Sequence, residues 1–389
     1  VDDKFGDETW KLGADWQVND WLRFRGSWGT SFRAPALFEL FLENQTGFQS
    51  QADIDLCANR ERGLELGTIT PEIDANCTAL GIDDFAPATG SAEIISRGGI
   101  GTLEPETSTA KTFSVVLTPT FSFLPDTRVS LAVDYFDIEV RDEIVQLGGT
   151  NIVIGCLNSE DVLNEPLCNQ ITRTPEGQPG EFNITEIFDP FLNISLQRNR
   201  GVDVTGRVVQ EAGRFGRISL LAQMTWQLED KVDVFGNNTG DVDLNGEVGD
   251  PRWIGDFNLT WAKGPWTVTY GLDVIGSADN KEDLLDDQAS AVGDDGCRTS
   301  LFRPGPGITP EEAAAGARVP FCPDVSVDAV AYHSLSVTRE IGERFQFTLG
   351  MANIFHKNPP RVSTVFNGGI AVFGQTPVFG SQYDWLGRR

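Results

Sequence analysis

Period-two alternation of apolar and polar residues is the dominant pattern along the chain. Between Trp266 and Val274 every second residue is apolar, and the residues between them are small or polar. Successive side chains of a β-strand point to opposite faces of the sheet, so this pattern predicts a strand with one apolar and one polar face. The same alternation recurs at 22–32, 129–135, 218–226, 253–261 and 345–351. In all, about eleven such strands are expected.

The connections between the predicted strands alternate strictly between short and long. Tight turns are expected at 16–21, 123–127, 212–217, 263–265 and 340–344. The other connections have roughly 76, 57, 22, 48 and 25 residues, far beyond ordinary loop lengths. In an antiparallel sheet this order gathers the short turns at one end and the long loops at the other, as outer-membrane barrels do with periplasmic turns and extracellular loops. A soluble β-sandwich, the rival all-β interpretation, has no reason to do this.

Hydropathy and charge narrow the class of protein further. The chain is 40% hydrophobic with a mean hydropathy of −0.20, and no run is long enough for a transmembrane helix. Barrel strands escape this test because they show lipid only at every second residue. The net charge of −27, from 30 basic and 57 acidic residues, disfavours nucleic acid as a partner. Most of the acidic residues crowd between the predicted strands, which indicates solvated loops.

Six cysteines fall into three neighbouring pairs, and each pair lies in one long connection. The pairs are Cys57 with Cys77, Cys156 with Cys168, and Cys297 with Cys322. A local disulfide limits the freedom of a long loop in the unfolded chain, so we expect three disulfides in an oxidising compartment. The alternative is six buried free thiols. If the long connections face outward, all three pairs lie on the outer side of the membrane. The strands are assigned without using the cysteines, so this agreement is independent support for the topology.

Several stretches, in order along the chain, resemble the C-terminal half of a TonB-dependent receptor. These stretches are Arg25–Leu40 with Phe32, Arg33, Ala34, Pro35, Glu39 and Leu40 at its core, Leu103–Ser108, Arg200-Gly201-Val202-Asp203, and Asn353-Ile354-Phe355 with Lys357, Pro359 and Pro360. The resemblance implies a transmembrane antiparallel barrel of about 22 strands, of which residues 1–389 supply about eleven. It also implies a plug domain and a TonB-contacting segment upstream of Val1, and a final strand that breaks off within 383–389.

The same resemblance implies a receptor in the bacterial outer membrane that imports a scarce solute with energy coupled from the inner membrane. Its expected partners are outer-membrane lipid, TonB through the upstream part, and a small-molecule ligand such as a ferric siderophore, cobalamin, haem or a carbohydrate. Two alternatives stay open. One is a passive porin, which needs no plug, and the other is a soluble or surface-attached β adhesion module.

The sharpest local motif is an acidic stretch in one long connection. Asp241, Asp243 and Asn245 alternate before Gly246, as in the first half of a calcium-binding loop. Arg252 stands where such a loop requires a bidentate Glu, so an EF-hand is not expected. A looser extracellular calcium site and an ordinary polar turn are the two interpretations, and no other cofactor is expected.

Catalytic and ligand-binding residues are harder to find. The chain has only two histidines, His333 and His356, and lacks the GxSxG, HExxH and glycine-rich phosphate-loop motifs, so an enzyme is not expected. Four arginines near strand ends or in loops are candidates for contacts with an anionic ligand, namely Arg33, Arg97, Arg198 and Arg200. The competing interpretation, which we favour, makes them lumen-lining cations paired with nearby acids. No substrate-binding residue is assigned.

Overall fold

The computed structural model describes residues 6, 8–66, 69–87, 90–235, 241–279, 326–366, 369–377 and 383–384. Ten strands form one continuous antiparallel path in chain order, and the short β11 (Asp241–Asp243) pairs with β10 beside it. The ten are β1 (Lys11–Asn19), β2 (Leu22–Arg33), β5 (Glu106–Leu117), β6 (Thr127–Val145), β9 (Leu192–Glu211), β10 (Arg217–Asp233), β12 (Trp253–Lys263), β13 (Trp266–Ile275), β16 (Val330–Ile341) and β17 (Phe345–Met351). The expected number of strands is therefore confirmed.

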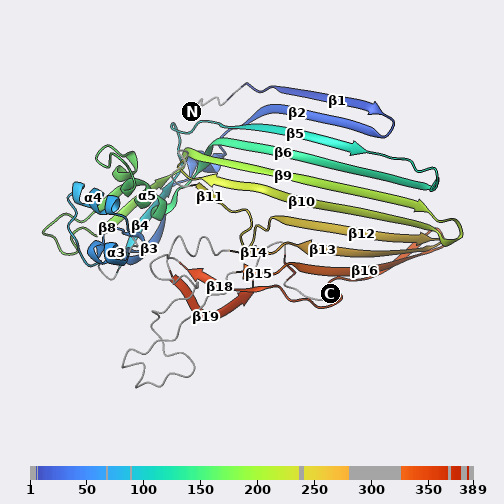
Figure 1. Cartoon of the computed structure of the whole chain (residues 1–389). Helices are drawn as coiled ribbons and strands as arrows, with labels where there is room; N and C mark the ends of the chain where they lie inside the picture. The colour runs from blue at the N-terminus through green and yellow to red at the C-terminus, as the bar shows by residue number, and fades with distance from the viewer. Residues whose placement is uncertain are drawn as a thin grey trace, which may run out of the picture.

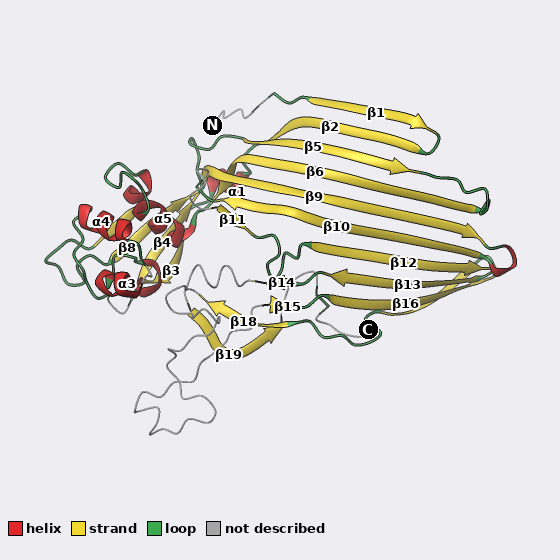
Figure 2. Ribbon diagram, viewed as in Figure 1, coloured by secondary structure: helices red, strands yellow, loops and turns green. Residues whose placement is uncertain are grey.

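Short and long connections alternate as the sequence predicts. Figure 1 shows the hairpin turns together at one end of the sheet, here called the short-turn end. The long connections 34–105, 146–191, 234–252 and 276–329 leave from the opposite, long-loop end. Figure 2 shows that the α-helices gather beyond the long-loop end, away from the sheet itself, while one short 3-10 helix lies at the short-turn end.

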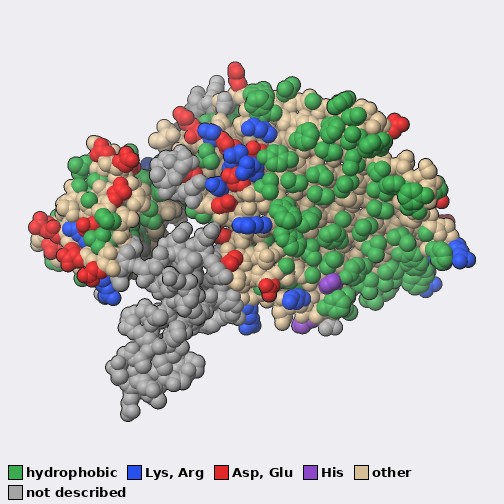
Figure 3. Space-filling model, in the orientation of Figure 1, with side chains coloured by type: hydrophobic (Ala, Val, Ile, Leu, Met, Phe, Trp, Pro, Cys, Tyr) green, Lys and Arg blue, Asp and Glu red, His purple; other side chains and the backbone are tan. Residues whose placement is uncertain are grey.

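The two faces of the sheet differ in chemistry because strand pairing holds the alternating rows in register. On one face Leu259 pairs with Tyr270, while on the other Thr260 pairs with Thr269 and their hydroxyl oxygens are 3.1 Å apart. We call these the apolar and the polar face. On the apolar face Trp16 is 63% exposed and Leu349 is 69% exposed. Figure 3 shows this face as a continuous apolar field. A field of this extent needs an apolar medium or partner against it.

Strands β6, β9 and β10 extend further toward the long-loop end than the alternation of apolar and polar residues predicts. The family resemblance implies that a strand starts at the string Arg200–Asp203, yet β9 begins eight residues earlier at Leu192. The added part has charged residues where the rest of the strand has apolar ones, so the pattern used for prediction stops although the backbone pairing continues. Gly201 lies under the ring of Phe136, where an added Cβ would stand 2.5 Å from a ring carbon.

Two long connections, 34–105 and 146–191, fold together into one unit, here called the loop domain. Strands β4 (Ser91–Arg97) and β8 (Ile184–Pro190) come from different connections and pair in parallel. The sheet is completed by β3 (Gln45–Ser50) and β7 (Ile171–Arg173), in the order β3-β4-β8-β7. The helices of the unit are α1 (Leu37–Phe41), α2 (Gln51–Ile54), α3 (Arg60–Leu66), α4 (Pro71–Ala79), α5 (Gly148–Leu157) and the 3-10 helix η1 (Pro166–Gln170). Alternation in the sequence did not predict this unit.

The loop domain has its own apolar core, drawn from both connections. Ile54 and Ile73 come from the first, and Ile152, Leu157 and Ile187 come from the second. The structure contains two of the three expected disulfides, Cys57–Cys77 and Cys156–Cys168, both packed into this core. Cys297 and Cys322 lie outside the described residues. Thr70 caps the N-terminus of helix α4, where its side chain accepts a hydrogen bond from the Ile73 N–H.

The remaining elements are short. They are the 3-10 helix η2 (Gly213–Phe215), β14 (Ala278–Asp279), which pairs with β15 (Ser326–Val327), and β18 (Arg361–Phe366), which pairs with β19 (Gly369–Pro377). The β18–β19 hairpin lies where the sequence predicted only a loop. The incomplete last strand expected at 383–389 falls outside the described residues except for Tyr383 and Asp384, which are not in a strand.

Removal of the Cys57–Cys77 disulfide should destabilise the loop domain and leave the large sheet intact. The double substitution C57A/C77A opens a loop of 20 residues, which should lower the free energy of unfolding of the domain by about 3 kcal/mol. Urea titration followed by brief proteolysis reads out cleavage within 34–105, while circular dichroism reports the sheet. An unchanged midpoint for cleavage, or a loss of the sheet signal at the same urea concentration, would contradict the separate stability of the domain.

Candidate functional site at the long-loop end

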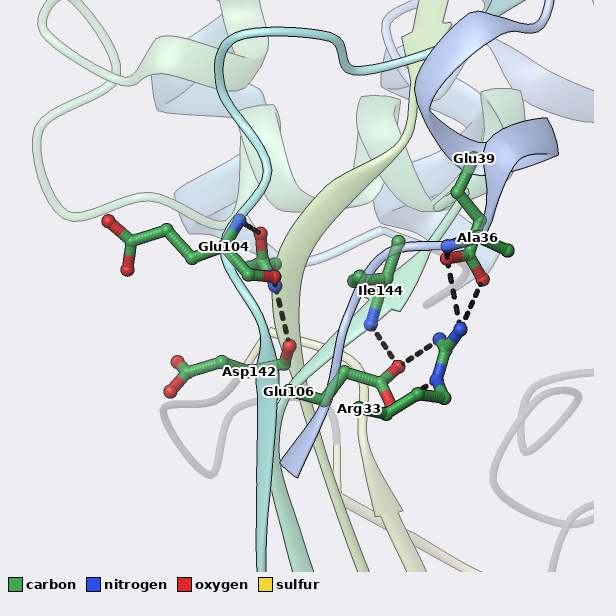
Figure 4. A network of polar contacts seen from close by, with 8 residues as sticks. Arg33, Ala36, Glu39, Glu104, Glu106, Asp142 and Ile144 are labelled. Atoms are coloured by element: carbon green, nitrogen blue, oxygen red, sulfur yellow. Dashed lines mark hydrogen bonds and ion pairs between the residues drawn. The ribbon is translucent and has the colours of Figure 1, made fainter. Parts of the chain in front are cut away.

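An arginine joins the end of β2 to the base of the loop domain (Figure 4). Arg33 Nε donates to Glu106 Oε2 over 2.7 Å, and Arg33 Nη1 donates to both carboxylate oxygens of Glu39 over 3.0 Å. The Glu106 carboxylate also accepts from the Ile144 N–H over 2.8 Å, and that of Glu39 accepts from the Ala36 N–H over 2.6 Å. One guanidinium thus connects β2, α1, β5 and β6 where the first long connection leaves the sheet.

A second set of contacts fixes the neighbouring strands. Asn193, near the start of β9, accepts from the Glu104 N–H over 2.7 Å and donates to the carbonyl oxygens of Glu104 and Asp142 over 2.8 Å. Asp142 has a positive φ of 55° and lies in the irregular stretch of the β6–β9 pairing. The two networks together hold the point at which both long connections enter and leave the sheet.

An apolar surface adjoins this junction. Leu37 and Phe38 on α1 are 77% and 63% exposed, while Leu40 on the opposite side is buried against Leu103 and Ile144. The Phe38 ring meets the Phe191 ring edge-on at 6.0 Å. A short amphipathic helix therefore presents aromatic groups beside the Arg33 network.

The four candidate arginines differ in their ion pairs and in the face of the sheet on which they lie. Arg33 is paired with Glu39 and Glu106, as the interpretation of paired cations expects. Arg97 ends β4 in the loop domain, is exposed, and has no ion pair with the part of the chain that the structure describes.

The other two candidates, Arg198 and Arg200, are paired with Asp137 and Glu229 but do not line the lumen. Their register with β6 places them on the same face as Val202 and Val204, which is the apolar face. The expectation that they point into the barrel is therefore wrong, because the alternation continues into the charged part of β9.

A polar cavity lies at the long-loop end between two connections. It has a volume of about 520 Å³ and is lined by 326–330 and 355–361. Lys357 and Arg361 bring positive charge to it, against the single carboxylate of Asp328. Asn353 fixes the backbone of this stretch, accepting from the Lys357 N–H over 2.7 Å and donating to the Lys357 carbonyl over 2.8 Å. These groups suit a small anionic solute.

The polar face carries a second concentration of positive charge, at the short-turn end. Arg128, Arg207 and Arg217 line a cavity of about 430 Å³. Glu211 is 3.2 Å from Arg217 and 3.8 Å from Arg128, measured between side-chain nitrogen and oxygen. Arginines thus outnumber acids at this end of the polar face.

The calcium motif forms a short strand and a turn. Asp243 Oδ1 accepts from the backbone N–H groups of Asp230 and Asn245, over 3.2 and 3.1 Å. These bonds are those expected of a polar turn. Among the described residues no group of three or more His, Cys, Asp or Glu side chains is arranged to hold a metal. The side chain of Asp241 lies outside what the structure describes, and calcium binding stays a prediction.

Comparison with known proteins identifies the family. Residues 1–354 match the family described as TonB dependent receptor-like, beta-barrel, and the chain belongs to this family. The open antiparallel sheet is accordingly part of a transmembrane barrel. Receptors of this family are outer-membrane transporters that bind ligands such as siderophores and interact with TonB. None of the curated proteins matches the chain. No helix within the described residues is long and apolar enough to cross a membrane.

Solved structures with the same fold include a ferric enterobactin receptor from Pseudomonas aeruginosa. Over 98% of this chain and 39% of that one, identity is 14% and the TM-score is 0.53. A mutant of that receptor in complex with enterobactin gives 13% identity and a TM-score of 0.51, over 98% and 39% of the two chains. A siderophore receptor, PirA, from Acinetobacter baumannii gives 13% and 0.48, over 91% and 38%. The chain therefore spans about two fifths of the length of the structures it matches.

Substitution of Arg33 should weaken the junction between the sheet and the loop domain. In R33M the Glu106 side chain, only 9% exposed, still accepts a hydrogen bond from the Ile144 N–H but loses its ion pair with Arg33. The cost should be about 1.5–3 kcal/mol, near the lower value because Arg33 itself is half exposed. A double-mutant cycle with E106Q, read by urea unfolding of the loop domain, should show strong coupling. Additive effects of the two substitutions would refute the network.

Asp189 should make the loop domain less stable as pH rises. Its side chain is buried in β8 and accepts from the Gly148 N–H over 3.2 Å. Burial raises the pKa of Asp189 above its usual value, although the Gly148 and Leu147 N–H groups act the other way. The folded state therefore binds the proton more tightly, and the stability gained at low pH is lost as pH rises through the raised pKa.

The substitution D189N should consequently stabilise the loop domain at pH 7 and have little effect near pH 3. The asparagine Oδ1 can still accept from Gly148 but carries no buried charge. Urea unfolding at a series of pH values measures the effect. D83N, at an exposed carboxylate of the same domain, is the control. Destabilisation at pH 7 by D189N would show that the ionised form is the one the fold favours.

Proposed function

We propose that this chain is the C-terminal barrel portion of an outer-membrane receptor that imports a small anionic metal chelate of the ferric siderophore class. The observation that carries the proposal is the family match over 1–354. The apolar face suits contact with lipid, and the loop domain at the long-loop end suits contact with a solute outside the cell. In this orientation the short turns face the periplasm and the loop domain faces outward. Cysteines paired in the loop domain agree with an oxidising exterior.

The mechanism divides between this chain and parts outside it. The exposed groups at the long-loop end bind the solute, and the polar face forms the wall along which it passes. A plug domain upstream closes the lumen, and TonB remodels it with energy coupled from the inner membrane. The junction at Arg33 contributes by holding the loop domain at a fixed place above the wall.

Charge supports a chelate over a neutral solute. The long-loop cavity contains Lys357 and Arg361, and arginines outnumber acids at the short-turn end of the polar face. Ferric siderophore complexes are commonly anionic, whereas the whole chain is strongly acidic and would repel them without such local cations. Two of the solved structures with the same fold are described as ferric enterobactin receptors.

Uptake by a strain that lacks the gene tests the proposal. Complementation with the intact receptor should restore accumulation of at least one radiolabelled ferric siderophore, and deletion of TonB should abolish it. Cobalamin, haem and oligosaccharides serve as competing solutes. Uptake that persists without TonB would identify a passive channel and refute the importer.

A matched pair of variants tests the role of the long-loop cavity. K357Q/R361Q should lower the affinity for an anionic chelate about tenfold, which corresponds to ~1.4 kcal/mol. R344Q, in the turn between β16 and β17 at the short-turn end, removes one positive charge away from that cavity and should leave affinity unchanged. Binding is measured by intrinsic fluorescence quenching in detergent. Equal losses in the two variants would remove the cavity from the binding site.

A further inference from the structure

The apolar face ends abruptly toward the long-loop end. Strand pairing places Phe113, Tyr135, Val202, Trp226 and Trp253 in one row across five strands. The next row outward on the same face contains Lys111, Asp137, Arg200 and Glu229. The surface thus changes from apolar to charged within one step of the pleat. Figure 3 shows blue and red side chains directly against the apolar field.

The charged rows are layered, with carboxylates beneath and cations above. Asp137 and Glu229 are only 12% and 11% exposed, while their partners Arg198 and Arg200 are 33% and 36% exposed. Arg198 donates to both oxygens of Asp137, over 3.1 and 3.0 Å. Glu139, in register with Arg198 on the same face, is 26% exposed, but it is paired with Arg141, which is 64% exposed. The most exposed charged groups of these rows are therefore guanidinium groups.

Two lysines extend this cationic surface to both sides. Lys111 is exposed on β5 and lies close enough to Asp137 to affect its charge. Lys231 on β10 pairs in register with Arg198. We call Lys111, Arg198, Arg200 and Lys231 the outer cation patch. It spans four neighbouring strands, and long cationic side chains of this kind can cover apolar surface with their stems while their heads stay in a polar layer.

We propose that the outer cation patch binds the phosphate groups of phosphorylated lipid headgroups in the outer leaflet. The site lies on the outside of the barrel wall, so a solute in the lumen cannot reach it. Its position fits the headgroup layer, because it begins where the apolar field ends and is rimmed by Trp28 and Trp226, both 49% exposed. Basic clusters at that depth attract anionic lipids. The inference depends on the membrane location in the proposed function and not on transport.

Selective quenching of tryptophan fluorescence tests the proposal. The intact receptor is refolded into phosphatidylcholine vesicles that contain brominated phosphatidic acid or, in parallel, brominated phosphatidylcholine. The wild-type protein should be quenched more strongly by the phosphomonoester lipid. Each cation removed from the patch should lower that preference about fivefold, in K111Q and further in K111Q/R198Q.

The single variant K111Q decides the outcome if R198Q disturbs folding, because no side-chain hydrogen bond of Lys111 is found within the described residues and Asp137 keeps its ion pair with Arg198. R128Q, on the polar face at the short-turn end, is the matched control and should behave as wild type. Equal quenching by the two lipids in the wild type, or an unchanged preference in K111Q, would overturn the proposal. A preference removed by inorganic phosphate at a concentration equal to that of the lipid would also overturn it, because a headgroup held at the bilayer surface should outcompete an equal amount of free anion.

The result can be separated from failure of the proposed function. A protein that inserts and prefers the phosphomonoester lipid but imports no siderophore would leave the lipid site standing and refute the transport proposal. A protein that is not quenched by either brominated lipid is not in the bilayer, and would refute the membrane location on which both depend.

Discussion

Backbone pairing is the constraint on which the whole structure depends. Each strand must present alternate residues to opposite faces, and antiparallel register carries that division from β1 to β17 without interruption of the path. A slip of one residue in any pair would move tryptophans and leucines to the polar face and arginines into the apolar field. The apolar face is largely exposed and has no protein packed over it in the described residues. The fold therefore makes sense only with lipid as the missing layer.

The sequence predicted the structure well wherever apolar and polar residues alternate along the whole strand. The strands at 253–261, 266–274 and 345–351 were predicted almost to their ends because apolar and small polar residues alternate over their full length. The extended parts of β6 and β9 were missed, since their charged rows hide the alternation. For the same reason Arg198 and Arg200 were wrongly placed toward the lumen, when only pairing with β6 and β10 shows which way they point.

The loop domain was beyond prediction for a different reason. Its central contact is a parallel pairing between β4 and β8, which are separated by about ninety residues of chain and by two strands of the main sheet. No local pattern encodes such a pairing. The cysteines pointed to closed loops in each connection, and the structure has two of those disulfides, but nothing indicated that both loops share one core. Arg33 and Glu106 were likewise visible as residues but not as partners.

A shared core also limits how the outer surface can change over generations. Exposed loops of surface proteins are usually free to diversify one at a time, because a substitution in one leaves its neighbours undisturbed. Here Ile187 of one connection and Ile54 of the other belong to the same core, and an insertion in either connection would disturb the β4–β8 pairing that both share. Single substitutions are then tolerated mainly on the exposed rims of the domain, whereas changes in the shared core must be matched in both connections.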